Sequence, residues 1–170
     1  MIAVGILVVV VGIVLVIGVL LPKNHVALRT ARFSQPPEIV WKAIADFGAS
    51  TSWRPDIQRV ERLQNHEGRP VWCEIDEHGK GITYEVLDSI PPYRLVRRIA
   101  DPKLPFGGTW TMEIEASNGG STVTITESGE VYNPLFRFVS RFIIGHTASI
   151  DGYLRALGKK WGEDVVLVTR

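Results

Sequence analysis

The sequence predicts an α+β domain in which one curved antiparallel β-sheet wraps a long C-terminal helix. Three observations support this fold class. The last third of the chain has helical periodicity, six strand-like runs with short separators come before it, and the chain opens with an unbroken apolar segment. Strands gathered in one part of the chain and followed by a helix are typical of α+β folds. We expect one transmembrane helix to precede this domain.

The opening segment, residues 1–21, contains no charged side chain. A helix over residues 2–21 would be about 30 Å long, which matches the hydrocarbon core of a bilayer. A cleavable signal peptide is the alternative, but it needs basic residues before a shorter apolar run. We therefore expect residues 1–22 to be an uncleaved membrane anchor. The basic residues that follow, Lys23, Arg29 and Arg32, favour a domain on the cytoplasmic side.

The rest of the chain has the size of one domain with a full core. We place this domain at residues 23–165 and a C-terminal tail at residues 166–170. The 170-residue chain has 19 Lys and Arg against 18 Asp and Glu, and this near-neutral balance gives no electrostatic reason to expect nucleic-acid binding. Cys73 is the only cysteine, so no internal disulfide can form, and we expect it to pack within a strand.

The domain begins with one strand and two short helical segments. Residues 25–33 alternate as a strand does, and residues 34–48 have helical spacing. Ser34 and the prolines after it suit a helix start, and Gly48 suits its end. Residues 49–56 are expected to form a second short helix or a turn.

The middle of the domain is predicted to be a series of strands. Their separators are rich in Gly, Pro and Asn, and such short loops join antiparallel neighbours. One separator, residues 101–109, either acts as a lid through Leu104 and Phe106 or is an ordinary hairpin loop. The six strand-like runs cover residues 57–64, 70–77, 81–89, 93–100, 109–116 and 121–128.

The closing helix is predicted to run from Pro134 to about Trp161, with Asn133 as its N-cap. On a helical wheel His146 falls near the middle of the apolar arc, so we expect its imidazole to face the sheet. We expect Arg137 on the opposite side. The apolar arc consists of Leu135, Val139, Phe142, Ile143, Ile150, Tyr153, Leu157 and Trp161.

A flanking face of the same helix carries only small residues. Two glycines inside a helix cost about 1 kcal/mol each relative to alanine, so this face either leaves room for a ligand or packs closely on the two short helices. Both interpretations stay open from the sequence. The face consists of Gly145, Ala148, Ser149, Gly152 and Ala156.

Strand alternation indicates which side chains point inward. In residues 121–128 the apolar parity carries Glu127 to the interior, where it either pairs with His146 or meets solvent at the strand end. The parity of residues 70–77 is unclear. We expect an apolar cavity whose ligand-binding residues are Tyr84, Trp110, Met112, Glu127, Phe142, His146 and Tyr153.

No catalytic or nucleotide-binding motif is present in the sequence. The four histidines, His25, His66, His78 and His146, are scattered, which argues against a metal site. We expect neither a metal nor a cofactor. Glu127 and His146 are the only candidate catalytic groups, and a structural role for His146 is favoured over catalysis.

Several segments resemble the SRPBCC superfamily, also called START-like, which includes polyketide cyclase/dehydrase-type proteins. The resemblance covers about residues 25–163, and its last segment is similar to that of a membrane-associated bacterial subgroup. The N-terminal apolar segment departs from most of the superfamily. The segments are "PPEIVWKAIADFGASTSWRPDI", "GITYEV", "PPYRLVRRI", "GGTWTMEIE", "TVTITESGEV" and "NPLFRFVSRFIIGHTASIDGYLRALG".

The resemblance implies a helix-grip fold, with seven antiparallel strands around the C-terminal helix and a hydrophobic cavity between them. It implies binding of lipids, sterols, polyketides or other hydrophobic molecules. It implies no catalysis, because no catalytic motif common to the superfamily exists to transfer.

The favoured function is therefore a membrane-tethered binding module for a lipophilic small molecule or lipid. The first alternative is a cyclase or dehydratase that uses His146 and Glu127 as acid and base. The second alternative is a membrane-tethered protein-interaction module.

Overall fold

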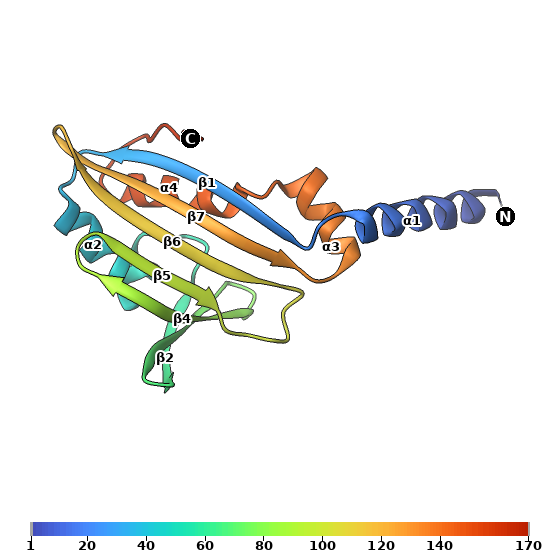
Figure 1. The fold of residues 1–170 in the computed structure, drawn as a ribbon, viewed down its shortest axis with the longest axis horizontal. Helices are drawn as coiled ribbons and strands as arrows, with labels where there is room; N and C mark the ends of the chain where they lie inside the picture. Colours follow the sequence, from blue (N-terminus) through green and yellow to red (C-terminus); the bar gives the residue numbers. More distant parts are fainter. Residues whose placement is uncertain (1, 170) are drawn as a thin grey trace.

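A curved seven-stranded antiparallel sheet forms the body of the protein, with strand order β1-β7-β6-β5-β4-β3-β2. The computed structural model describes residues 2–169, with side chains from residue 6 onward. Helix α4 lies against the concave side of the sheet, and α1 projects beyond one end (Figure 1). All seven predicted strands are confirmed, within two or three residues at their ends. They are β1 (Asn24–Phe33), β2 (Arg59–His66), β3 (Arg69–Ile75), β4 (Gly81–Ile90), β5 (Arg94–Ile99), β6 (Phe106–Ser117) and β7 (Gly120–Val131).

The helices lie at the two ends of the chain and between β1 and β2. The helix predicted for residues 34–48 is confirmed as α2, and the second short segment is a 3-10 turn, η1. The helices and helical turns are α1 (Ile2–Leu20), α2 (Pro37–Ala45), η1 (Gly48–Ser52), α3 (Pro134–Val139), the π-helical turn η2 (Ser140–Ile144) and α4 (Ala148–Lys160).

The closing helix is not continuous, which corrects the prediction of one helix from Pro134 to Trp161. Its start is as expected, because the Asn133 side chain accepts a hydrogen bond from the Phe136 amide at 3.2 Å. The helix then widens to π spacing and stops at Gly145, whose φ of 83° is left-handed. Glycine takes this conformation at little cost. His146 therefore lies in the turn before α4 and not inside a helix.

Strand alternation correctly predicts the core. Val123 and Ile125 of β7 are fully buried, as is Met112 of β6. On β3, where the sequence was ambiguous, Trp72 and Glu74 face the interior: Trp72 packs against the core, and Glu74 is buried there. The concave face of the sheet is thus apolar except at a few positions, which include Glu74 and Glu127.

Arg137 fastens α1 to the domain, which corrects the prediction that it faces solvent. Its guanidinium is buried and donates hydrogen bonds to the carbonyl oxygens of Gly18 and Leu21, both at 3.3 Å. It also donates to the carbonyl oxygen of Val131 at 2.8 Å. A Cβ on Gly18 would lie 2.1 Å from the Pro134 carbonyl oxygen, so α1 and α3 touch where only glycine fits.

No helix in the described part of the chain is both long and apolar enough to cross a membrane. The transmembrane helix predicted for residues 2–21 is therefore not confirmed.

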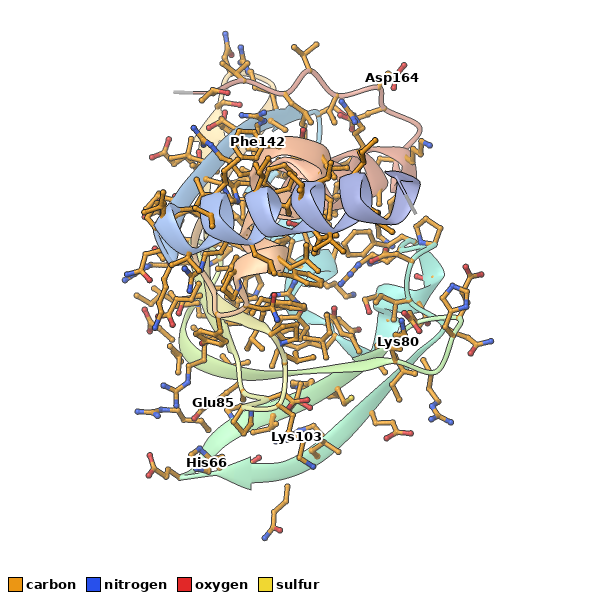
Figure 2. The ribbon with its side chains drawn as sticks, turned by 90° about the vertical axis from the view of Figure 1, so that its right-hand side faces the viewer. His66, Lys80, Glu85, Lys103, Phe142 and Asp164 are labelled. Atoms are coloured by element: carbon orange, nitrogen blue, oxygen red, sulfur yellow. The ribbon has the colours of Figure 1, made fainter. Side chains whose placement is uncertain are left out.

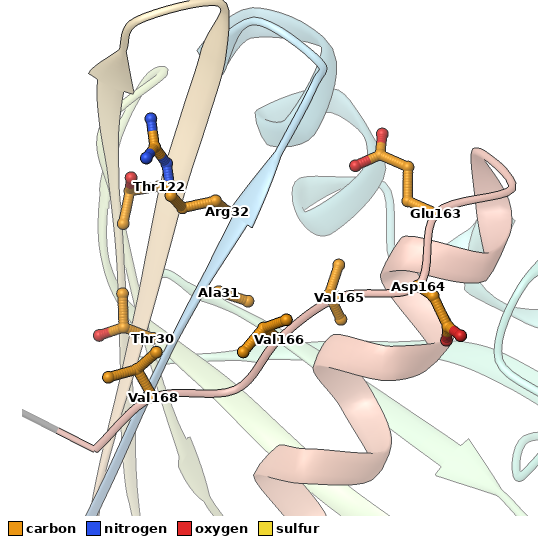
Figure 3. Close-up of a pocket in the computed structure, with 9 residues that line it drawn as sticks. All are labelled: Thr30, Ala31, Arg32, Thr122, Glu163, Asp164, Val165, Val166 and Val168. Atoms are coloured by element: carbon orange, nitrogen blue, oxygen red, sulfur yellow. The ribbon is translucent and has the colours of Figure 1, made fainter.

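The C-terminal segment runs back along β1 instead of leaving the domain. Val168 exchanges two backbone hydrogen bonds of 2.9 Å with Thr30. A surface groove of about 710 Å³ lies between this segment and β1, with Val165 and Val166 on one side and Ala31 on the other (Figure 3). The last residue of the predicted tail, Arg170, lies outside the described residues.

Candidate functional site

Two adjoining cavities lie between the concave face of the sheet and the helices. The larger, of about 630 Å³, contains Arg54 and Arg97, and we call it the arginine cavity. The smaller, of about 320 Å³, contains His25 and His146, and we call it the histidine cavity. They share a wall formed by Ile82, Tyr84, Phe106, Trp110 and Ser149.

Glu127 is the polar centre of the histidine cavity, and its partner is His25. Its Oε1 lies 3.1 Å from His25 Nε2, and its Oε2 accepts from Trp110 Nε1 at 2.7 Å. Ser149 Oγ lies 3.4 Å from the same Oε2. The prediction that Glu127 points inward is confirmed. Neither of the two alternatives for Glu127, pairing with His146 or meeting solvent, is found. Its carboxylate contacts His25, Trp110 and Ser149 instead.

His146 faces the cavity, but it contacts His25 and not the carboxylate. The two imidazole rings are stacked with centroids 3.9 Å apart. Burial, together with the neighbouring His25 and Arg141, holds the pKa of His146 below its ordinary value, while Glu127 acts weakly in the opposite direction. The ring is thereby kept neutral, which suits packing or hydrogen bonding better than ion pairing.

The turn that carries His146 is fixed by β1. Arg29 Nη2 donates to Thr147 Oγ1 at 3.0 Å, and Arg29 Nε donates to Asp151 Oδ1 at 2.8 Å. One arginine therefore ties β1 to the turn and to the first turn of α4. Gly129 completes the arrangement, because a Cβ there would lie 2.2 Å from the His25 ring.

The arginine cavity contains a buried ionic triad. Glu74 Oε1 accepts from Arg97 Nη1 at 2.8 Å, and Glu74 Oε2 accepts from Arg54 Nη1 at 2.7 Å. Burial alone would raise the pKa of Glu74, but the two guanidinium groups outweigh it and hold that pKa below its ordinary value. Glu74 in turn raises the pKa of Arg97 against the opposing effect of burial. All three groups are charged at neutral pH.

Aromatic rings surround the Arg97 guanidinium. Its Cζ lies 4.4 Å from the centroid of Tyr84, 5.2 Å from that of Trp110 and 5.7 Å from that of Tyr153. Such distances are within the range of cation–π attraction. Burial raises the pKa of Tyr84 to about 12, against the opposing charge of Arg97. Tyr84 is therefore a neutral hydroxyl under physiological conditions.

The small face of α4 lines the arginine cavity and leaves it open. Ala148, Ser149, Gly152 and Ala156 all border this space, and a Cβ on Gly152 would meet no atom within 4 Å. Of the two interpretations of this face, room beside the helix is the one that the geometry favours at Gly152.

The predicted lid residues border the cavities. Leu104 lines the arginine cavity and Phe106 lines both cavities, and each is half-buried. Phe106 already belongs to β6, so the loop itself is shorter than predicted. These two side chains form part of the wall.

Two predicted ligand-binding residues lie outside both cavities. Phe142 is 59% exposed on η2 and packs on Phe138, because the helix break at Gly145 turns it away from the sheet. Figure 2 shows Phe142 beside the helices, far from Glu85 and His66 among the strands. Met112 is 1% exposed and belongs to the closed core. Tyr84, Trp110 and Tyr153 line the cavities as predicted.

Sequence reasoning missed His25, Arg54, Glu74 and Arg97. For His25 a signal exists: Ala27, Ala31 and Phe33 share its parity on β1 and are all buried. For Arg54, Glu74 and Arg97 the sequence contains no such signal, because each of them is buried only together with the other two. Each would be costly to bury alone.

A further cluster of titratable residues lies on the other face of the sheet. Glu85 is buried on the outer face of the sheet, where Arg98, Arg69 and His66 surround its carboxylate. Cys73 is half-buried on β3. Within the described residues, no group of His, Cys, Asp and Glu is arranged to hold a metal ion.

Comparison with known proteins identifies the family. Residues 27–160 match the family described as polyketide cyclase / dehydrase and lipid transport. The chain belongs to this family. It is the START-like group that the sequence resembles, and the helix-grip fold is its fold. A search of curated proteins finds no match.

Solved structures of low sequence identity share this fold. A START superfamily protein from Mycobacterium smegmatis has a TM-score of 0.63 at 16% identity, over 80% of this chain and 96% of its own. A protein from Thermobifida fusca has a TM-score of 0.61 at 20% identity, over 81% and 93%. The Zhui aromatase/cyclase from Streptomyces sp. R1128 has a TM-score of 0.61 at 13% identity, over 80% and 93%. These likenesses concern the fold alone.

Proposed function

We propose that this family member binds a hydrophobic small molecule or lipid in the two adjoining cavities. The observation that carries the proposal is their shared wall of aromatic and aliphatic side chains beside the open face of α4 at Gly152. Ligand pockets are usually concave, mostly apolar and furnished with a few polar groups. The family's lipid-transport and cyclase descriptions support the same class of ligand.

Filling the open face tests this proposal. Leucine at position 152 would project into the arginine cavity, and it favours a helix over glycine by roughly 1 kcal/mol. We expect Gly152→Leu to stay folded and to lose binding of a neutral lipophilic dye such as Nile red in a fluorescence titration. The matched control is Arg155→Leu on the exposed side of α4, which should bind the dye as the natural chain does. Equal binding by Gly152→Leu would contradict the proposal.

We also propose that α1 holds the domain at a membrane. Nearly all of the apolar side chains of α1 from Ile6 to Leu20 are exposed, and contiguous apolar surface of this kind is typical of lipid or protein contact. The basic residues after α1 favour the cytoplasmic side.

Deletion of residues 1–22 should abolish carbonate-resistant membrane association. A reporter fused after Arg170 should be active only in the cytoplasm; activity outside it would contradict this orientation.

A cyclase- or dehydratase-type enzyme is the second candidate. It is favoured by one observation: His25, Glu127 and His146 all line the histidine cavity, where groups of this kind can exchange protons with a ligand. The ligand extracted from the Glu127→Gln variant, incubated with the natural chain, should then lose the mass of one water molecule. The Glu127→Gln variant should bind it without conversion. An unchanged ligand would leave binding as the function.

A further inference from the structure

Arg97 is a buried cation whose hydrogen-bonding capacity is mostly unused. It lies on β5, is 3% exposed and lines the arginine cavity. A guanidinium has five N–H donors. Among the residues that the structure describes, only Glu74 accepts from Arg97, through Nη1, and Nε has no partner. Nε is enclosed by protein atoms, so the N–H groups of Nη2 are the donors that a ligand in the cavity can reach. Hydrogen bonds from a guanidinium to a carboxylate are among the stronger ones in proteins.

The two guanidinium groups of the arginine cavity do not have equal numbers of carboxylate partners. Arg97 and Arg54 share the single carboxylate of Glu74. Arg54 has a second partner, Asp56, whose Oδ2 accepts from Arg54 Nη2 at 2.6 Å. Arg54 thus has a second carboxylate and Arg97 has only its share of Glu74, so Arg97 is the guanidinium whose free donors a ligand anion would occupy.

The rings around Arg97 hold the guanidinium in place. Tyr84, Trp110 and Tyr153 lie within 4.4–5.7 Å of its Cζ. Cation–π contacts are made through ring faces and leave the N–H groups in the guanidinium plane able to donate. Two of these rings, Tyr84 and Trp110, are also the wall shared with the histidine cavity. An apolar chain that started at Arg97 would therefore run along aromatic surface.

We propose that the ligand is an amphiphile with a carboxylate, which accepts from the Nη2 of Arg97 while its apolar part lies along Tyr84 and Trp110. This inference rests on the proposed binding function and names the ligand class. Glu74 keeps both guanidinium groups oriented.

Three probes of one chain length test the proposal: hexadecanoic acid, its methyl ester and hexadecan-1-ol, each measured by equilibrium dialysis with the full chain. The acid should bind about tenfold or more tightly than the other two, since charge-assisted hydrogen bonds exceed neutral ones by such amounts. Arg97→Lys keeps a positive charge for Glu74 but has no second terminal nitrogen to donate to the ligand. It should lose most of the preference for the acid. The double variant Arg97→Gln/Glu74→Gln, which removes one charge of each sign, should lose all of it and still bind the alcohol.

Arg94→Gln is the matched control, because Arg94 lies on the same strand with its side chain exposed to solvent. It should keep the preference for the acid. Equal affinity of the natural chain for all three probes would overturn this inference and leave the binding function standing. An acid preference that survives in both Arg97 variants would also overturn it. Failure of all three probes to bind would contradict the binding function and this inference together.

Discussion

His146 stacks on His25 with ring centroids 3.9 Å apart and ring planes inclined by 20°. The contact joins the turn before α4 to the first strand of the sheet, at the wall of the histidine cavity. Two imidazoles at this distance pack well when neutral and repel when both are protonated. The stack therefore helps to hold the turn before α4 against β1.

We expect acid to destabilise the protein because His146 is protonated less readily in the folded state than in the unfolded chain. Its pKa is lower in the folded protein than the ordinary value, mainly because it is buried and because His25 and Arg141 lie near. The unfolded chain then binds more protons, so stability falls as the pH drops below about 6.5. The melting temperature of the natural chain should fall more steeply between about pH 7.5 and pH 5.5 than that of His146→Phe.

His78 provides the control for this measurement, because it lies exposed in a turn. His78→Phe should keep the pH profile of the natural chain. An unchanged profile in His146→Phe would show that His146 makes no such contribution.

Glu74 is expected to be essential for stability. Removing one partner of a buried ion pair typically costs about 3–5 kcal/mol, because a buried charge loses its counter-ion, and here two guanidinium groups share the carboxylate. Glu74→Gln should lower the free energy of unfolding by roughly this amount in urea denaturation. Glu61, which pairs with Arg59 at the surface, is the control, and Glu61→Gln should change stability by less than about 1 kcal/mol. Equal effects of the two variants would contradict a buried triad.

Gly18 is expected to fix the position of α1. A side chain at this position would collide with the Pro134 backbone, whereas a side chain at Gly12 would meet nothing within 4 Å. Gly18→Val should displace α1 from α3 and break the hydrogen bonds from Arg137. Trypsin should then cut faster after Lys23, which is exposed beside this junction.

Gly12→Val is the control, because it introduces the same side chain into the same helix without a collision. It therefore has the same effect on helix propensity as Gly18→Val. It should be cut at the rate of the natural chain. Equal rates for the two valine variants would contradict close packing of α1 on α3.

Local sequence patterns were sufficient for the sheet but not for the site. Alternation correctly predicts the inward side of β4, β6 and β7, because one face of each strand packs on the core. The helical wheel fails for Phe142, because it assumes one continuous helix and Gly145 interrupts it. The prediction for Arg137 fails for another reason: two of its acceptors, the carbonyl oxygens of Gly18 and Leu21, lie more than a hundred residues away in the sequence.

No local sequence pattern could predict the buried triad of Arg54, Glu74 and Arg97. Arg54, Glu74 and Arg97 come from three separate segments, and each is buried only because the other two are. Burial of a single charge is unfavourable. When each segment is considered by itself, its charged residue is therefore expected at the surface. Only the pairing of β3, β4 and β5 brings Glu74 and Arg97 to the same cavity.

Mass spectrometry of an organic extract from the purified natural chain tests the central claim most directly, with Gly152→Leu and Arg155→Leu measured alongside. We expect the natural chain and Arg155→Leu to retain a lipophilic molecule in proportion to protein, and Gly152→Leu to retain little of it. Absence of such a molecule from the natural chain, or equal retention by Gly152→Leu, would contradict a ligand held between α4 and the sheet.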